Sequence, residues 1–190
     1  MKFSALIIFT IIFFNTIFAL SNTERAERQY KFISKLYENK SYLQVIDEGK
    51  KLIKFSPDFK KIDAIYFILG ESSYQLKQYE NAEEYFLLLI KNYPKSSLLQ
   101  NCYHSLGWLY FINKNYQKSI VYFSKINKSN LLEESNYKCG EAYYALGNYD
   151  DAINKFKLCT EKEGEYFDRS LYHLGLCYSK KNDDANAKIV

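Results

Sequence analysis

The sequence is poor in the residues that interrupt regular structure. Its 190 residues include only two prolines and seven glycines, too few for the many tight turns of a multi-stranded sheet. Lysine, glutamate, leucine and isoleucine are abundant, a composition that favours helices. The sequence therefore predicts an all-α protein, and the chain is long enough for one domain or a short array.

The motifs of common enzymes are missing from the sequence. His104 and His173 are its only histidines, and it contains no H-E-x-x-H motif, glycine-rich phosphate loop or nucleophile elbow. We therefore expect neither catalysis nor a cofactor or metal. His104 is interpreted as a polar residue of a binding surface rather than as a general base.

A block of one charge sign is missing as well. The 26 basic and 22 acidic residues are interspersed and give a formal net charge of +4. This pattern is typical of a solvated surface and does not indicate a nucleic-acid-binding protein. Aromatic residues are instead the excess, with 19 tyrosines and 14 phenylalanines, which must fill helix interfaces or line an exposed surface.

The first 21 residues differ in composition from the rest of the chain. Lys2 is followed by an apolar run from Ala5 to Leu20, and the small residues "ALS" precede Asn22. This pattern predicts a signal peptide over residues 1–21 and an exported, periplasmic protein. The alternative is an uncleaved segment that anchors the chain to the membrane, and only then is a membrane a partner.

Similar stretches recur along the remaining sequence. "AIYFILGESSYQLKQYENAEEYF" contains Gly70 and "NYKCGEAYYALGNYDDAINKF" contains Gly140, with related stretches around Gly107 and Gly175. The successive glycines are 37, 33 and 35 residues apart, and such a period is the signature of a repeat array.

Each repeat carries further residues at fixed distances from its glycine. A small residue follows twelve positions later, and in the repeats of Gly70, Gly107 and Gly140 a phenylalanine follows sixteen positions later, as Ala152 and Phe156 do after Gly140. Small residues at two such positions allow two antiparallel helices to approach closely, and the aromatic ring fills the space beside them.

The pattern resembles the tetratricopeptide repeat (TPR), a helix-turn-helix unit of 34 residues. The resemblance covers nearly all of residues 26–190 and implies a right-handed solenoid of antiparallel helix pairs. The expected repeats are a degenerate first one over 26–59, complete ones over 63–96, 100–131 and 133–164, and an incomplete one over 168–190. In the first, Ile33 takes the glycine position and Gly49 the aromatic position.

The resemblance also implies a protein or peptide partner, bound in a concave groove lined by the first helix of each repeat. Groove positions in the family lie three residues before the glycine and one, four and five after it. The predicted groove residues are Phe67, Tyr74, His104, Trp108, Phe111, Tyr137, Tyr144 and Tyr172. The alternative is that some of these rings pack only against neighbouring side chains of the same chain.

The stretch "FLLLIKNYPKSSLLQNCYHSLGWLYF" resembles the bacterial cell-envelope branch of the family, which implies a role in envelope assembly. A different hypothesis is a membrane-anchored scaffold that oligomerises through its terminal repeat. The second helix of that repeat looks too short to cover Leu171, Leu174 and Tyr178, and we expect a frayed C-terminus.

The four cysteines allow two interpretations. None forms a C-x-x-C pair, which argues against a zinc ribbon or a redox motif. All four are consistent with small buried side chains. Export would permit disulfides, and the best candidate pair is Cys139 with Cys159, on facing helices of one repeat.

Overall fold

A computed structural model describes residues 22–127 and 129–187. Within these ranges the chain forms helices joined by short turns, with no strand. It divides into two compact units, Met1–Tyr93 and Pro94–Val190, called unit 1 and unit 2 below. The predicted signal peptide lies outside the described residues.

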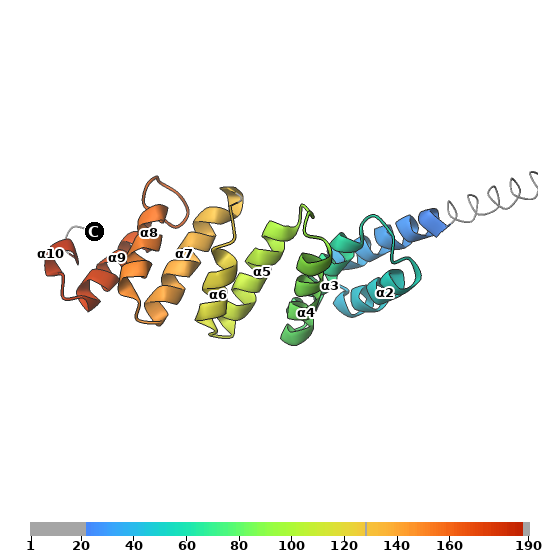
Figure 1. Cartoon of the computed structure of the whole chain (residues 1–190), viewed down its shortest axis with the longest axis horizontal. Helices are drawn as coiled ribbons and strands as arrows, with labels where there is room; N and C mark the ends of the chain where they lie inside the picture. Colours follow the sequence, from blue (N-terminus) through green and yellow to red (C-terminus); the bar gives the residue numbers. More distant parts are fainter. Residues whose placement is uncertain (1–21, 128, 188–190) are drawn as a thin grey trace, which may run out of the picture. The chain divides into compact units, whose positions relative to one another are not determined.

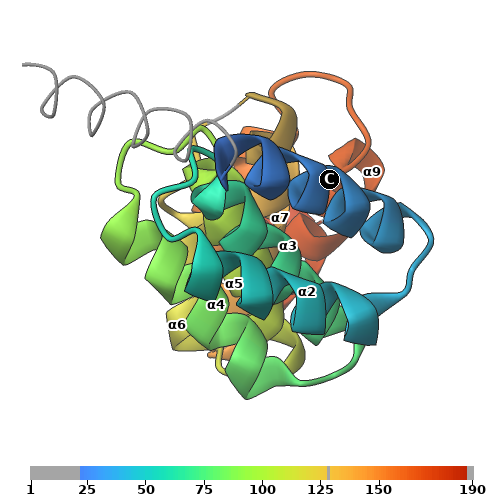
Figure 2. The ribbon, with the colours of Figure 1, turned by 90° about the vertical axis from the view of Figure 1, so that its right-hand side faces the viewer.

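Unit 1 contains two antiparallel helix pairs (Figure 1). The helix over residues 22–38 pairs with α2 (Tyr42–Phe55), and α3 (Ile62–Gln75) pairs with α4 (Tyr79–Asn92). Figure 2 shows the helix over 22–38 beside α2, where the Gln29 side-chain amide donates a hydrogen bond to the Glu48 carbonyl at 3.1 Å. The core is aliphatic and includes Ile33, Val45, Leu52, Ile65 and Leu69.

Unit 2 contains three helix pairs. They are α5 (Leu99–Ile112) with α6 (Tyr116–Phe123), α7 (Ser129–Ala145) with α8 (Tyr149–Cys159), and α9 (Phe167–Lys180) with α10 (Asp184–Ala187). Each first helix packs against its own second helix, and α7 and α9 also pack against the second helix of the preceding pair. The helices thus bury their apolar sides through contacts with their neighbours in sequence.

Glycine and phenylalanine fit together inside the three complete repeats. A Cβ atom added at Gly140 would lie 2.6 Å from the Phe156 ring, and additions at Gly70 and Gly107 would meet Phe86 and Phe123 at 2.5 and 2.6 Å. All three rings are buried. The close packing predicted from the spacing is therefore confirmed, since only glycine leaves room for the ring.

The first repeat solves the same problem differently. Ile33 occupies the glycine position and is fully buried, while Gly49 stands where the other repeats have phenylalanine. A Cβ atom at Gly49 would lie 2.7 Å from Leu69 of α3. The missing ring is replaced by a leucine of the next repeat, which explains why this repeat is degenerate in sequence.

The turn inside each helix pair has one conformation throughout. The residue seven positions after the glycine position has a positive φ in every repeat, between 57° and 78°. These residues are Lys40, Lys77, Lys114, Gly147 and Asn182. At the second turn, the Lys77 amide donates to the Tyr74 carbonyl and the Gln78 amide to the Ser73 carbonyl, both at 2.9 Å, so that free carbonyls at the helix end are paired.

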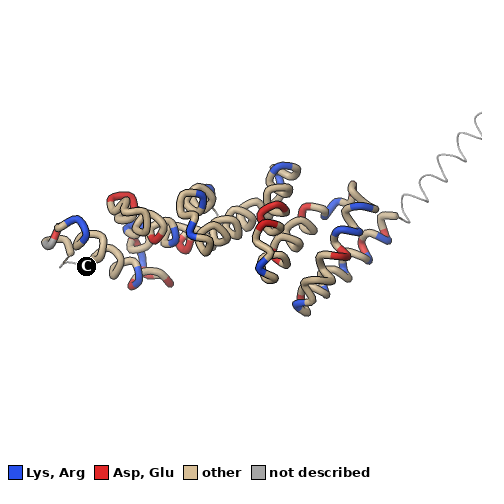
Figure 3. The backbone as a smooth tube through the Cα atoms, turned by 90° about the horizontal axis from the view of Figure 1, so that it is seen from below, with Lys and Arg blue, Asp and Glu red and all other residues tan. Residues whose placement is uncertain are grey.

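Acidic and basic residues are interspersed along the helices of both units (Figure 3). None of the helices in the described part of the chain is long and apolar enough to span a membrane.

The candidate disulfide between Cys139 and Cys159, the second of the two interpretations, is not formed. All four cysteines are free and buried. Cys139 packs with Phe123 and Ile126 of the preceding repeat, whereas the Cys159 sulfur lies 3.5 Å from the Glu133 carbonyl oxygen. Burial raises the pKa of the Cys159 and Cys177 thiols to about 11, so the reactive thiolate form is suppressed. The interpretation as small buried side chains is confirmed.

The expectation of an uncovered apolar face on the last repeat is also wrong for Leu174. This side chain is 2% exposed and packs in one cluster with Phe156 and Ala152 of α8, while Leu171 and Tyr178 are half-buried against that cluster. The residue before the glycine position faces the preceding repeat, as Leu69 and Cys139 do. The cover for Leu174 therefore comes from the repeat before it.

Candidate partner-binding face

The residues predicted to line a groove fall into two sets, because the chain forms two units. Phe67 and Tyr74 lie half-buried on α3 of unit 1, with ring centroids 6.0 Å from Phe86 and 5.9 Å from Tyr79. The other six belong to the first helices of the three pairs in unit 2. Contacts between this second set and the polar side chains beside it connect all three helices.

We call this surface of unit 2 the aromatic face. Its rings are Trp108 and Phe111 of α5, Tyr137 and Tyr144 of α7, and Tyr172 of α9. Its polar residues are His104 of α5, Glu134, Lys138 and Glu141 of α7, and His173 of α9.

Lys138 connects α7 to the rings of α5. Its ammonium lies 4.5 Å from the centroid of Trp108, 4.9 Å from that of Phe111 and 5.4 Å from that of Tyr137. The same Nζ atom donates a hydrogen bond of 2.7 Å to Glu141, and the lysine side chain is only 15% exposed. Cation–π attraction and a shielded ion pair together fix the positions of these rings.

His104 makes the second contact between α5 and α7. Its Nε2 atom lies 2.9 Å from a carboxylate oxygen of Glu134, and its ring meets Phe123 edge-on. Hydrogen bonding to His104 lowers the pKa of Glu134, and a hydrogen bond from Trp108 adds to this effect. Glu134 is therefore held as a carboxylate, consistent with the interpretation of His104 as a polar surface residue.

His173 connects α9 to α7 and α8. Its ring stacks on Phe156 at 5.0 Å between centroids, and its Nε2 atom lies 3.2 Å from the Tyr137 hydroxyl and 3.9 Å from Glu141. Tyr144 and Tyr172 meet the imidazole edge-on at 6.2 and 5.5 Å. Burial lowers the pKa of His173, although the nearby Glu141 opposes this change.

The rings of the aromatic face differ in accessibility. Tyr137 is 5% exposed, and its burial raises the pKa of the hydroxyl to about 12, with a further contribution from Glu141. Trp108, Phe111 and Tyr144 are half-buried, whereas Tyr172 is 66% exposed. Tyr137 therefore serves the packing of the repeats, as the alternative interpretation proposed, while the other rings reach the surface.

Three polar residues of this face are missing from the sequence prediction. Lys138 and His173 lie two residues before their glycines and Glu134 lies six before, so none falls at the four positions expected from the family. The sequence offered one signal for them, since Lys138, His173 and Glu134 each lie within three residues of a predicted groove residue.

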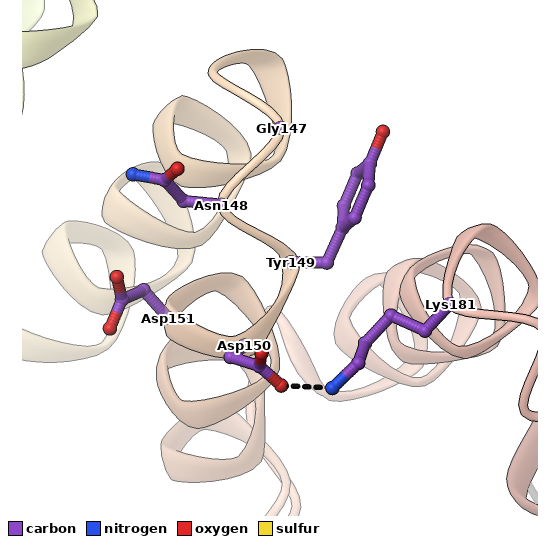
Figure 4. A pocket seen from close by; sticks show the side chains of 6 residues that line it. All are labelled: Gly147, Asn148, Tyr149, Asp150, Asp151 and Lys181. Carbon is purple, nitrogen blue, oxygen red and sulfur yellow. Dashed lines mark hydrogen bonds and ion pairs between the residues drawn. The ribbon is translucent and has the colours of Figure 1, made fainter.

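A concavity separate from the aromatic face lies at the turn between α7 and α8. It has a volume of about 410 Å³ and is lined by Gly147, Asn148, Tyr149, Asp150, Asp151 and Lys181. Asp150 and Lys181 form an ion pair, and the carboxylates of Asp150 and Asp151 point apart (Figure 4). The two acidic side chains therefore do not converge on a common ligand position.

No cluster of three or more His, Cys, Asp or Glu side chains suited to a metal ion occurs among the residues that the structure describes.

The architecture is that of an α-solenoid, in which stacked helix hairpins present their first helices side by side. Tetratricopeptide repeat family models match residues 64–96 and 134–163, and a second such model matches residues 100–130. The chain is a tetratricopeptide repeat protein, as its sequence pattern predicted.

Solved structures support the same fold. A crystal structure of MamA is 21% identical, covers 87% of this chain and 87% of its own, and superimposes with a TM-score of 0.73. YrrB, described as a TPR protein with an unusual peptide-binding site, is 16% identical, with coverage of 90% of this chain and 86% of its own and a TM-score of 0.72. A MamA structure from Desulfovibrio magneticus RS-1, covering residue 41 to its end, is 15% identical, with coverage of 86% and 89% and a TM-score of 0.67.

These likenesses confirm the predicted fold class, an all-α TPR solenoid of antiparallel helix pairs. A comparison with curated protein sequences gives no significant match.

Proposed function

We propose that this protein is an adaptor that binds a peptide or protein segment on the aromatic face of unit 2. The observation that carries the proposal is the unbroken series of contacts across α5, α7 and α9, in which Trp108, Lys138 and His173 connect one helix to the next. A segment that lies across the three helices would find rings already fixed in position. The peptide-binding description of YrrB agrees with this proposal.

The chemistry of the face suits a mixed apolar and polar ligand. Large aromatic rings supply contact area at a low cost in conformational entropy. Here the cost is lower still, because Lys138 and Glu141 already restrict the rings around them. Carboxylates, imidazoles and tyrosine hydroxyls between the rings can hydrogen-bond to the backbone of a bound segment.

Replacing both Trp108 and Phe111 by alanine is expected to weaken partner binding by about 2 kcal/mol or more, roughly 30-fold, because aromatic anchors dominate such interfaces. The partner is first trapped by a photo-crosslinking residue placed at the exposed position Tyr172 and identified by mass spectrometry. Binding of the purified partner is then measured by calorimetry for the wild type and the variants.

Two further variants separate binding from folding. Trp108 and Phe111 pack partly against the buried cluster of Phe123, so helicity is checked by circular dichroism. Tyr172→Ala removes a ring that is 66% exposed and should weaken binding by about 1 kcal/mol with the fold intact. Phe55→Ala, at a 73% exposed ring of unit 1, should leave affinity unchanged. Equal affinity for wild type, Tyr172→Ala and the double variant would refute the proposed face.

Export is the second part of the proposal, and it is supported by the sequence of residues 1–21. We expect the protein in its native host to be found in a soluble envelope fraction, with an intact mass lower by about the first 21 residues. The full-length mass in a membrane fraction would instead support the alternative, in which residues 1–21 anchor a scaffold. A role in envelope assembly then depends on the identity of the trapped partner.

A further inference from the structure

The two histidines of the chain reach the same helix from its two neighbours. His104 reaches α7 from α5 and contacts Glu134, while His173 reaches α7 from α9 and lies near Glu141. Both belong to the aromatic face. Histidine is the side chain whose ordinary titration falls near neutral pH, so the groups around His173 decide whether the α9 junction responds to acidification.

The His104 contact joins α5 to α7 through a charged partner. Glu134 faces this imidazole from α7, at 2.9 Å, and α6 contributes the apolar ring of Phe123. Hydrogen bonds to a carboxylate are stronger than neutral ones, so this contact holds α5 against α7.

The surroundings of His173 disfavour a positive charge on its imidazole. The Nδ1 atom is buried without a hydrogen-bond partner, and α8 offers only the Phe156 ring on which the imidazole stacks. From α7 the ring faces Tyr137, Tyr144 and Glu141, but Glu141 already pairs with Lys138 at 2.7 Å. A second proton would therefore place an unpaired N–H donor in an apolar environment, beside a lysine charge that repels it.

The sign of the resulting pH dependence follows from these contacts. Burial holds the pKa of His173 below its ordinary value of 6.5 in the folded chain. The unfolded or undocked segment then binds more protons than the folded one as the pH falls below that value. The stability contributed by the neutral imidazole is thus fully present above pH 6.5. It is lost as the pH falls through the His173 pKa of the unfolded chain and then through the lower pKa of the folded chain.

We infer that the His173 contact makes the attachment of α9 sensitive to pH, so that mild acidification loosens α9 from α7 while α5 stays attached. Under the proposed function, which this inference assumes for its consequence in binding, the change removes Tyr172 and His173 from the partner and weakens the complex. The aromatic face would then release its ligand from the α9 side when the pH falls.

Hydrogen exchange tests the inference on the full chain without any partner. Between about pH 7.5 and about pH 5.5, exchange of the α9 amides, corrected for intrinsic rates, should accelerate about threefold or more, while α5 exchange stays within about twofold. His173→Phe keeps the stack on Phe156 but cannot titrate, and its α9 exchange should not depend on pH. His173→Gln serves the same purpose if the phenylalanine variant folds poorly, and His104→Gln should retain the acceleration in α9.

Two results would overturn the inference: α9 exchange in the wild type that is the same at both pH values, or an equal acceleration in His173→Phe and His173→Gln. Affinity for the crosslinked partner is measured at the same two pH values. A partner that binds equally well at both contradicts the release and leaves the adaptor proposal intact. If the partner fails to bind at either pH while α9 exchange still accelerates on acidification, the result contradicts the adaptor proposal alone.

Discussion

Replacing Phe156 by alanine is expected to lower the free energy of unfolding by about 3 to 5 kcal/mol, the usual cost of emptying a phenylalanine site in a packed core. The ring is fully buried, covers Gly140 and stacks on His173. One truncation therefore removes packing inside the fourth repeat and the surface on which the fifth repeat docks. Urea unfolding followed by circular dichroism measures the loss.

Leu158→Ala on the same helix is the matched control for Phe156→Ala. Its side chain is 45% exposed, and the substitution should cost less than about 1 kcal/mol. A Phe156→Ala protein as stable as this control would show that the glycine and phenylalanine pairs contribute little to stability, contrary to the packing described above.

Leu69→Ala is expected to lower the free energy of unfolding by about 2 to 5 kcal/mol, because the side chain is fully buried. Leu69 fills the space above Gly49 in the degenerate first repeat, so a large cavity should remain. Urea unfolding and amide exchange of α2 and α3 measure the effect.

The control for Leu69→Ala is Leu43→Ala, at a 66% exposed position of α2. This substitution should change the free energy of unfolding by no more than about 0.5 kcal/mol. Should Leu69→Ala cost no more than this control, the role assigned to Leu69 as the replacement for the missing aromatic ring would be wrong.

Periodicity made the fold predictable because packing inside a repeat is local. Gly140, Ala152 and Phe156 lie within 16 positions of one another, and their contact follows from helix geometry and residue size alone. The Ser119 hydroxyl even donates a hydrogen bond of 2.9 Å to the Gly107 carbonyl, joining the two small positions of the third repeat directly.

Contacts between repeats were harder to predict. The errors for Cys139 and Leu174 share one cause, since both precede a glycine and both turn toward the preceding repeat. The polar part of the aromatic face escaped prediction for a related reason. Lys138, Glu134 and His173 each reach a residue 30 or more positions away, and the direction of a long side chain depends on charges and rings that only the fold brings near.

The uniform turn within each helix pair constrains where the chain can change in length. The connections inside pairs, such as 76–78, 113–115 and 146–148, all have three residues, and each includes the residue of positive φ. The connections between pairs differ in length, with six residues in 56–61 and seven in 160–166, and none of their described residues has a positive φ. Insertions and deletions in relatives should therefore accumulate between hairpins, and an affinity tag or reporter placed in 161–165, where every residue is exposed, would disturb the array less than one placed in 76–78.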